Sequence, residues 1–271
     1  ELLILYDKSS DNSLKIIEEL LKNDERIRLI FNINKGLINS LNYGIKKSKG
    51  EYIARMDSDD ISLPSRIKLQ IRHIIKHKLD VCGCHYFRIN EKDKITDISY
   101  VPLTHKNCFI RLFSSVPFAH PTTIIRKNFL ITNNLTYGIN STYAEDLDMW
   151  INLYNSGAKF GNIDKVLFKY RVLENSLSRQ NKTLLRNISL SHYSSFFNKN
   201  IKDIYVTINE KFEPSNEIDK YYFARLVIRY FLEKYDFQTI RNLKEIKIKI
   251  IIRALTVEIK NLFIFQSIKK R

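Results

Sequence analysis

The sequence has few cysteines, and they do not form an evident paired pattern. There are three, Cys82, Cys84 and Cys108. An odd number without paired spacing argues against a disulfide scaffold, so we expect reduced thiols in a cytosolic protein. Cys82 and Cys84 flank a single glycine, which leaves a metal site open as an alternative. A Cys-x-Cys pair within an apolar, strand-like run and without a second pair is more typical of a buried core.

Long apolar runs are also missing. None reaches the roughly 18 residues that a membrane-spanning helix needs, and no signal peptide is recognisable. The chain begins inside an apolar, strand-like run over residues 1–6 without an initiator methionine, so we expect a segment to precede residue 1. With 44% hydrophobic and 27% charged residues in a chain of 271, the composition excludes general disorder and predicts one large domain, or one domain with an appendage.

Acidic residues are few relative to basic ones. Lys and Arg total 45 against 29 Asp and Glu, which gives a net charge of +16. A charge of this sign suits an anionic partner, which is a nucleic acid, an anionic membrane face or a phosphorylated ligand. The basic residues are spread along the chain and are not clustered with stacking aromatic residues on one module. A nucleic-acid-binding protein is therefore the rival interpretation and not the preferred one.

The spacing of apolar residues alternates between strand-like and helix-like over the first sixty residues. The predicted strands are 2–6, 27–31 and 52–56, separated by helices that begin near Ser13 and span 37–48. This order predicts an α/β fold with a mostly parallel sheet. Ligands of such sheets bind beyond the carboxyl ends of the strands. Asp7 and the acidic residues 57–60 follow two of these strand ends.

The alternation continues to about residue 180. Further predicted elements are helices over 64–78, 105–113 and 144–157, and strands over 81–90, 95–101 and 166–172. After residue 180 glycine disappears and long Lys/Ile/Phe/Tyr stretches with helical spacing follow. We therefore predict a ligand-binding domain over 1–180 and a basic helical extension over 181–271. Within the extension, we expect 220–257 to pack on the chain and 258–271 to contact an anionic membrane.

Three carboxylates follow the third predicted strand, in Asp57-Ser58-Asp59-Asp60. Such carboxylates repel one another and are costly to keep ionised unless a cation lies among them. Mg²⁺ or Mn²⁺ takes few protein carboxylates and completes its shell with water and phosphate, so an ion here would hold a diphosphate and act as a Lewis acid. The alternative is a solvated acidic turn that caps the helix beginning near Pro64.

Two other uses of this acidic motif fit less well. An EF-hand loop counted from Asp57 needs glycine at its sixth position and glutamate at its twelfth, where the sequence has Ser62 and Lys68. A phosphatase with a D-x-D nucleophile normally carries that motif on its first strand, whereas this one follows the third.

A second acidic pair, Glu145-Asp146, stands at the start of a predicted helix with Leu147 and Trp150 on its apolar face. Acidic residues in a first helical turn are common because they meet the positive end of the helix dipole. The functional alternative is a general base at a rigid helix start, facing the ligand-binding edge of the sheet.

Taken together, these motifs resemble those of family 2 glycosyltransferases, an inverting group with the GT-A fold. The resemblance covers about residues 1–180 and rests on an aspartate turn after a strand, N-x-G, N-x-G-I, K-G-E-Y-I, D-x-D-D, P-x-R, E-D before a helix, and Y-R, in that order. Here these read Leu5-Tyr6-Asp7-Lys8-Ser9-Ser10-Asp11, Asn34-Lys35-Gly36, Asn42-Tyr43-Gly44-Ile45, Lys49-Gly50-Glu51-Tyr52-Ile53, Asp57-Ser58-Asp59-Asp60, Pro64-Ser65-Arg66, Glu145-Asp146 and Tyr170-Arg171.

The sequence departs from the family pattern at three places. The family's opening strand and its nucleotide-contacting turn are absent, and we expect them to precede residue 1. Tyr6 and Lys8 stand where the family's D-D-G-S turn has Asp and Gly, so only Asp7 of that turn carries over. Many members have a histidine after Y-R that can reach the metal, whereas this sequence continues Val172-Leu173-Glu174. A third metal ligand is therefore not identified.

The resemblance implies a GT-A-like, mostly parallel sheet flanked by helices, with nucleotide-sugar binding and catalysis in residues 1–180 and a helical extension over 181–271. It implies Asp146 as the catalytic base and Asp59 as a ligand of Mg²⁺ or Mn²⁺. The residues it implies in nucleotide-sugar binding are Asp7, Asn34, Gly36, Asp57, His120 and Arg171. For His120 the alternative is a satisfied structural histidine, and for Arg171 it is an ordinary salt bridge.

The implied reaction moves a sugar from a nucleotide diphosphate sugar, expected to be UDP-linked, to a hydroxyl of a cell-surface glycan such as lipopolysaccharide or capsule, with inversion. The implied partners are that donor and a glycan or lipid-linked glycan acceptor, with no nucleic acid. The charge of +16 suits a cytoplasmic protein that rests on the anionic inner face of the cytoplasmic membrane. A catalytically inactive relative that only binds sugar nucleotides is the alternative.

Overall fold

A computed structural model describes residues 1–32, 36–173, 181–210, 216–234, 243, 246 and 248–269, without the side chains of 248 and 262–269. The chain begins with a small unit of two strands and one helix. These elements are β1 (Leu2–Tyr6), α1 (Ser13–Asn23) and β2 (Ile27–Phe31). The two strands are parallel, with Leu2 opposite Ile27, and they form a sheet of their own. The strands predicted over 2–6 and 27–31 are confirmed.

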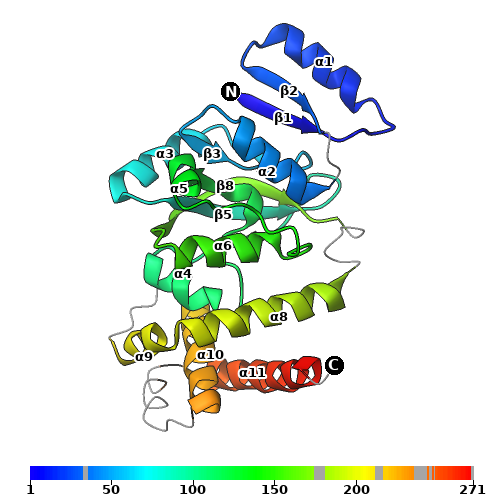
Figure 1. Cartoon of the computed structure of the whole chain (residues 1–271). Coiled ribbons are helices and arrows are strands. Elements are labelled where there is room, and N and C mark those ends of the chain that lie inside the picture. Colours follow the sequence, from blue (N-terminus) through cyan, green and yellow to red (C-terminus); the bar gives the residue numbers. More distant parts are fainter. Residues whose placement is uncertain are drawn as a thin grey trace.

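This first unit lies at the edge of the molecule in Figure 1, beyond the larger sheet. No described residue before Asp60 is buried. The unit contacts the rest of the chain through α2 (Leu37–Lys47). Gly44 of that helix faces β1 so closely that a Cβ atom would lie 2.8 Å from Leu5 Cδ1. A larger residue in place of the glycine of the N-x-G-I motif would require the Leu5 side chain to move.

Six strands of the described chain form the larger sheet. They are β3 (Tyr52–Ala54), β4 (Ile61–Ser62), β5 (Val81–Ile89), β6 (Ile95–Ser99), β7 (Ile124–Arg126) and β8 (Phe160–Arg171). Their order is β3-β7-β5-β8-β4, with β6 beside β5. Strands β5 and β8 are parallel, and the other described pairs of this sheet are antiparallel.

The α/β class with a helix-flanked sheet is confirmed, but the expectation of mostly parallel pairing is wrong for this sheet. The reason is that β3 pairs with β7 and not with β1 or β2. The one described neighbour of β3 in this sheet, β7, thus comes from a segment about seventy residues away and runs in the opposite direction. The strand-helix-strand alternation of the first sixty residues gave no sign of this partner.

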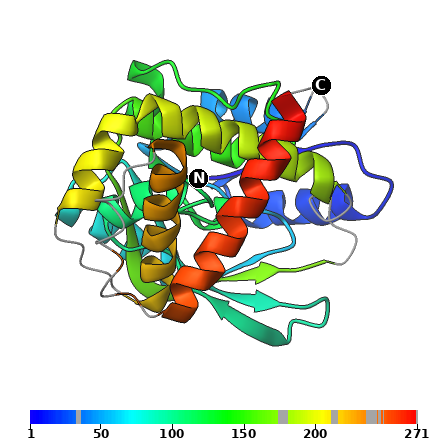
Figure 2. The same cartoon turned by 90° about the horizontal axis from the view of Figure 1, so that it is seen from below.

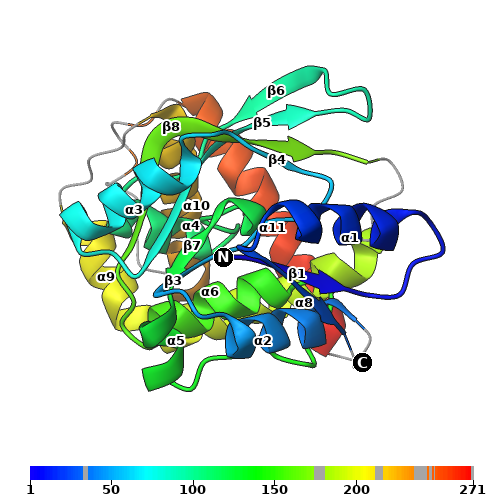
Figure 3. The ribbon, with the colours of Figure 1, turned by 90° about the horizontal axis from the view of Figure 1, so that it is seen from above.

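Helices cover both faces of the larger sheet (Figures 1 and 3). Those before residue 160 and not yet named are α3 (Arg66–His77), α4 (His105–Leu112), the 3-10 helix His120–Thr122, α5 (Lys127–Thr132) and α6 (Glu145–Asn155). The extension contains α8 (Lys182–Lys199), α9 (Ile201–Asn209), α10 (Glu217–Lys234) and α11 (Ile248–Lys269). In Figure 1, α4 and α6 lie between the sheet and the helices of the extension.

The helical extension shares one hydrophobic core with the first 180 residues. All eight residues 223–230 of α10 are buried, so this helix is enclosed on all sides at its centre. Phe113, which directly follows α4, packs against Phe196 of α8 with tilted rings whose centroids are 4.8 Å apart. Buried side chains from β5, α4, α6, α8, α10 and α11 belong to a single cluster. The extension therefore completes the core of the first 180 residues, and the two segments pack as one body.

An ion pair between the last two helices is buried in this core. Arg225 Nε of α10 donates to Glu258 Oε1 of α11 at 2.5 Å, and the two side chains are 9% and 3% exposed. The expectation that 258–271 contacts a membrane throughout is therefore wrong for its first residue, because Glu258 faces inward. The side chains from 262 onward lie outside the described residues. No described helix is both long enough and apolar enough to cross a bilayer.

The cysteines are buried free thiols, as their apolar setting predicts. Cys82 and Cys84 lie on β5, and Cys108 lies on α4. Burial raises the pKa of Cys82 to about 12 and that of Cys84 to about 11, so both stay protonated at neutral pH. The Cys-x-Cys pair is part of the core.

Candidate active site

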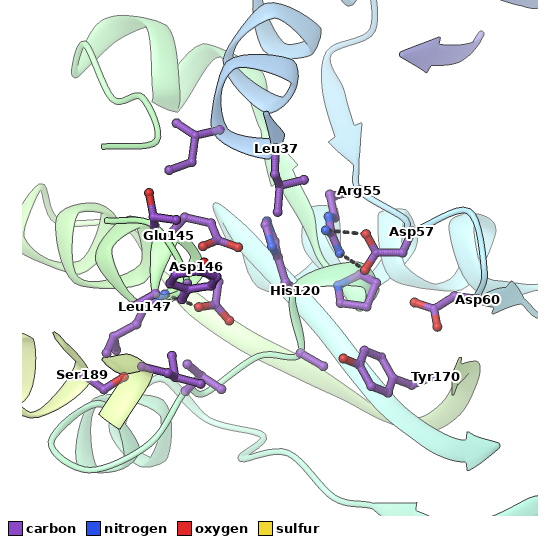
Figure 4. A pocket seen from close by; sticks show the side chains of 18 of the residues that line it. Leu37, Arg55, Asp57, Asp60, His120, Glu145, Asp146, Leu147, Tyr170 and Ser189 are labelled. Carbon is purple, nitrogen blue, oxygen red and sulfur yellow. Dashed lines mark hydrogen bonds and ion pairs between the residues drawn. The ribbon is translucent and has the colours of Figure 1, made fainter. Parts of the chain in front are cut away.

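A cavity of about 1130 Å³ opens where the carboxyl end of β3, the starts of α2 and α6, the end of β8 and one face of α8 meet. Figure 4 shows part of its lining, with carboxylates on two sides. Of the predicted site residues, the cavity is lined by Gly36, Asp57, Asp59, His120, Asp146 and Arg171. Asp7 is exposed at the end of β1 and is not among the lining residues. Asn34 lies outside the described residues.

Gly36 precedes α2 at the rim of the cavity. Its φ of 104° lies in a region that side chains other than glycine rarely adopt, and open space surrounds the position of a Cβ atom. The glycine of the N-x-G motif is thus required by backbone conformation. It directs the chain from β2 into the helix that borders the site.

Arg55 and Asp57 form a two-armed ion pair at the end of β3. Arg55 Nη1 lies 2.6 Å from Asp57 Oδ2, and Arg55 Nη2 lies 2.6 Å from Asp57 Oδ1. Figure 4 shows the pair beside His120. The Arg55 side chain is only 11% exposed, so its charge acts on the interior of the site. Sequence reasoning missed Arg55, although a basic residue two positions before D-x-D-D is a signal that could have been weighed.

Asp60 is the buried carboxylate of the acidic motif. Its Oδ1 accepts the Arg171 backbone N–H at 2.7 Å, and its Oδ2 has no partner among the described residues. Burial raises the pKa of Asp60 to about 7, the Arg171 hydrogen bond lowers it in part, and the nearby charges of Asp57 and Asp59 raise it further. The three carboxylates of the motif therefore differ: Asp57 is paired, Asp60 is buried and Asp59 is exposed.

The Asp59 carboxylate makes no hydrogen bond or ion pair with the described residues and lines the cavity. The described residues contain no group of three His, Cys, Asp or Glu side chains placed for a metal ion. Mg²⁺ and Mn²⁺ sites that serve phosphates often use one or two carboxylates, with water and phosphate oxygens completing the shell. An exposed Asp59 next to the unpartnered Oδ2 of Asp60 is an oxygen-donor set that fits such an ion.

Arg171 holds the acidic motif from the end of β8. Its Nε donates to the Asp59 carbonyl oxygen at 2.7 Å, Nη1 to the Asn90 carbonyl oxygen at 2.9 Å, and Nη2 to Asp93 Oδ1 at 2.6 Å. These three contacts tie the acidic motif to the β5–β6 turn. The salt-bridge alternative for Arg171 is thus observed, and all three guanidinium nitrogens already have protein partners.

This geometry leads to a first prediction. Arg171→Lys should lower kcat/KM by about tenfold, because an ammonium cannot span three acceptors and Asp59 would lose its fixed main-chain position. Asp93→Asn keeps the other two contacts and removes only a charge on a 64% exposed side chain, so its effect should stay within about threefold. Steady-state kinetics of both variants test this. If both variants lose the same factor in kcat/KM, the contact between Arg171 and the Asp59 carbonyl oxygen does not position the acidic motif for the reaction.

Asp146 begins α6 on the opposite wall of the cavity, beside Glu145 (Figure 4). Its Oδ1 accepts the Leu147 backbone N–H at 2.7 Å. Burial raises the pKa of Asp146 to about 6, and the charge of Glu145 raises it further. A carboxylate whose pKa lies close to the working pH is suited to accept a proton and release it again.

His120 is a buried histidine with a satisfied partner. Its Nε2 and the Tyr137 hydroxyl are 2.7 Å apart, and its ring meets Trp150 edge-on. Burial lowers the pKa of His120 well below the usual value, and Arg55 lowers it further, so the ring is neutral. These contacts are those of a structural histidine whose hydrogen bond is satisfied, as the alternative interpretation expects. The His120 side chain also lines the cavity.

The loop that leads to α6 is held by the N-x-G-I motif. The Asn42 side chain donates to the Tyr137 carbonyl oxygen at 2.9 Å and accepts the Tyr137 N–H at 2.8 Å. Since Tyr137 bonds His120, this one asparagine links α2 to the loop and the histidine. The motif asparagine thus has a structural role that its sequence position alone did not reveal.

The extension contributes one wall of the cavity. Leu185, Ser189 and Tyr193 of α8 recur every four residues, so one face of this helix borders the site. Burial raises the pKa of Tyr193, and the charge of Asp146 raises it further. Sequence reasoning missed these residues, because helical spacing predicts a buried face without indicating what that face contacts.

Comparisons with known proteins agree with this geometry. The sequence profile of the family "Glycosyl transferase family 2" matches residues 1–133. An uncharacterised glycosyltransferase of Haemophilus influenzae is 32% identical over 282 residues, which cover 91% of this chain and 86% of that protein. The chain belongs to the family 2 glycosyltransferases. The O-antigen biosynthesis glycosyltransferase WbnJ of Escherichia coli is 31% identical over 168 residues, covering 58% of this chain and 61% of that protein.

Solved structures support the same fold. The crystal structure of Staphylococcus aureus TarS residues 1–349 in complex with UDP-GlcNAc aligns with a TM-score of 0.55 and 18% identity, over 96% of this chain and 72% of that one. Relatives from Rickettsia are longer proteins, and this chain spans 32% of their length. The GT-A-like architecture with a helical C-terminal region is therefore shared with structures of distant sequence.

Proposed function

We propose that this glycosyltransferase moves a sugar from a UDP-linked donor to a hydroxyl of a cell-surface glycan, with inversion at the anomeric carbon. The observation that carries the proposal is that one cavity joins an exposed carboxylate beside the acidic strand end to a carboxylate of raised pKa at a helix start. The first suits a diphosphate with its cation, and the second suits a proton acceptor. A single displacement needs both groups at one site.

In this reaction Asp146 removes the proton from the acceptor hydroxyl. The acceptor oxygen then forms a bond to the anomeric carbon while the bond from that carbon to the diphosphate oxygen breaks, and the electron pair leaves with the diphosphate. Attack from the face opposite the leaving group inverts the configuration. Asp59 would hold Mg²⁺ or Mn²⁺, which supplies positive charge to the departing diphosphate.

The donor and acceptor would occupy different ends of the cavity. The donor end is the side of Gly36 and Asp57, where Arg55 fixes the Asp57 carboxylate. The acceptor end is the side of Asp146 and the α8 wall, where Ser189 and Tyr193 offer hydroxyl groups. We also propose that Asp7 and Asn34 contact the nucleotide, because the family resemblance implies this role for both residues.

The similarity to an O-antigen biosynthesis glycosyltransferase supports a cell-surface glycan as the acceptor. We propose that the enzyme works in the cytoplasm at the inner face of the cytoplasmic membrane, on a glycan or lipid-linked glycan acceptor. The net charge of +16 favours that anionic surface.

The proposal is tested first at Asp59. Asp59→Ala should weaken Mn²⁺-dependent UDP binding by about tenfold or more, because the cation loses a protein ligand, while the melting temperature stays near that of the parent. Calorimetry with UDP in Mn²⁺ and in EDTA measures this. Asp203→Ala, which removes an exposed carboxylate of α9 that does not line the cavity, is the matched control and should bind as the parent does.

Full Mn²⁺-dependent UDP affinity in Asp59→Ala would end the metal assignment. Mn²⁺-dependent UDP binding by the parent, without hydrolysis or transfer from any UDP-sugar, would instead favour an inactive relative.

A further inference from the structure

Helix α11 exposes a row of apolar side chains that nothing in the described structure covers. Ile252, Leu255 and Ile259 are 57%, 38% and 40% exposed. Their spacing of three and four residues places them on one side of the helix. The opposite side, with Ala254 and Glu258, is buried against the rest of the chain.

A row of basic side chains runs beside the apolar one. Lys249, Arg253 and Lys260 are exposed at positions that lie about a quarter turn around the helix from the isoleucines. The Arg253 guanidinium also lies 5.0 Å from the centroid of the Tyr221 ring of α10, so the two lysines are the basic residues that the test changes. Between residues 249 and 260 the sequence has a single acidic residue, Glu258. Because Glu258 is turned inward to Arg225, the outward face of this stretch carries positive charge without an acidic neighbour on the same helix.

The position of α11 leaves this face accessible. Figures 1 and 2 show α11 on the outside of the molecule, on the side opposite the small β1–β2 sheet. The helix packs on α8, where Arg186 donates to Asn261 Oδ1 at 3.4 Å. Another face of α8 lines the cavity through Leu185 and Ser189. The exposed face of α11 is therefore one helix away from the proposed acceptor end of the active site.

We propose that this face of α11 binds the surface of an anionic lipid bilayer. Apolar side chains flanked by basic ones suit the boundary between acyl chains and headgroups, where the apolar row is removed from water and the basic row meets lipid phosphates. The helix lies along the membrane and does not cross it. This deepens the proposed location of the enzyme, and it assigns residues 249–260 to the contact.

The alternative surface is α3, which also carries exposed isoleucines and lysines. Ile67 and Ile75 are 46% and 61% exposed, and Lys68 and Lys76 are exposed on the same helix. This helix lies on the far side of the larger sheet from α11 in Figure 1. It therefore provides a control with the same residue types, the same number of substitutions and comparable exposure.

The test is co-sedimentation of the whole chain with vesicles that contain 30% phosphatidylglycerol in phosphatidylcholine, and with pure phosphatidylcholine vesicles. We expect binding to the anionic vesicles that falls with salt. Lys249→Gln/Lys260→Gln should weaken this binding by about tenfold or more, since each basic residue near an anionic surface contributes about fivefold. Ile252→Ser/Ile259→Ser should weaken it to a similar extent.

The control variants are Lys68→Gln/Lys76→Gln and Ile67→Ser/Ile75→Ser, which should bind anionic vesicles like the parent. Equal losses in the α3 and α11 pairs would overturn the proposal, because binding would then follow net charge alone. Binding that ignores anionic lipid and salt would also overturn it. So would a parent dimer that the Ile252→Ser/Ile259→Ser variant converts to monomer, since the face would then be an interface between copies. The assay reads no turnover, so failure of the proposed transfer reaction leaves its result unaffected.

Discussion

Asp146→Asn is expected to lower turnover by roughly 10²–10⁴-fold, which is the usual contribution of a positioned general base. The amide has nearly the shape of the carboxylate but cannot accept the acceptor's proton. Donor binding should be nearly unchanged, because Asp146 begins α6 on the wall opposite Asp57 (Figure 4). Single-turnover rates and UDP-sugar affinity, measured on the same preparation, separate the two effects.

The pH dependence gives this prediction a second measurement. The pKa of Asp146 is raised to about 6, so the base is protonated and inactive at lower pH, and kcat should fall as the pH drops through about 6. Glu145→Gln removes a charge that contributes to the raised pKa, so the fall in kcat should move to lower pH while the plateau stays. Loss of donor binding with unchanged turnover in Asp146→Asn would instead make Asp146 a helix cap.

Glu258→Leu is expected to reduce the free energy of unfolding by about 3–5 kcal/mol, because it leaves the buried Arg225 guanidinium without its partner. Arg225 also donates from Nη1 to the Ser114 carbonyl oxygen at 3.4 Å, and its guanidinium lies 5.7 and 5.9 Å from the ring centroids of Tyr221 and Tyr222, but none of these contacts supplies a negative charge. Urea unfolding followed by circular dichroism measures the change. An exposed pair gives the matched control: Glu210→Gln removes an ion pair with Lys106 whose side chains are 57% and 34% exposed, and should cost at most about 1 kcal/mol.

A double substitution identifies the cause of that loss. Arg225→Leu/Glu258→Leu removes both charges, so it should recover a large part of the stability lost in Glu258→Leu. If the double variant is as unstable as the sum of the two single variants, packing and not the unpaired charge is responsible. The result also decides how the extension can be shortened, since any deletion that begins at 258 removes this ion pair.

The sequence predicts elements well where periodicity is long and clearly bounded. The helix at 145–155 has a regular apolar face and an acidic start, and Gly157 with a φ of 87° ends the turn that follows it. The first half of β8 was missed because Asn162, Asp164 and Lys165 interrupt its apolar pattern. Strand β4 was missed because two residues are too few to show a period. Pairing partners such as β3 and β7 depend on contacts that no local pattern records.

The site was predictable in part for a similar reason. Carboxylates at a strand end and at a helix start are visible as local motifs, and Asp57, Asp59 and Asp146 line one cavity. Contacts across the chain were not visible, such as that of Arg171 with the Asp59 carbonyl oxygen 112 residues away. Asp7 follows β1, which belongs to a separate two-stranded sheet, so its absence from the cavity lining follows from strand pairing and not from its motif.

The shared core also has a consequence for synthesis. Ribosomes release the chain in order, and parts of a protein that form closed cores can fold as they emerge. Here Arg225 emerges well before Glu258, its partner 33 residues later, and Ala254 of α11 belongs to the same core as Val81 of β5. We expect the nascent chain to keep the faces of α8 and α10 that pack against α11 uncovered until α11 has left the exit tunnel. The enzyme should then complete its folding only after translation of α11. Until that point, chaperones would bind the apolar faces that are still uncovered.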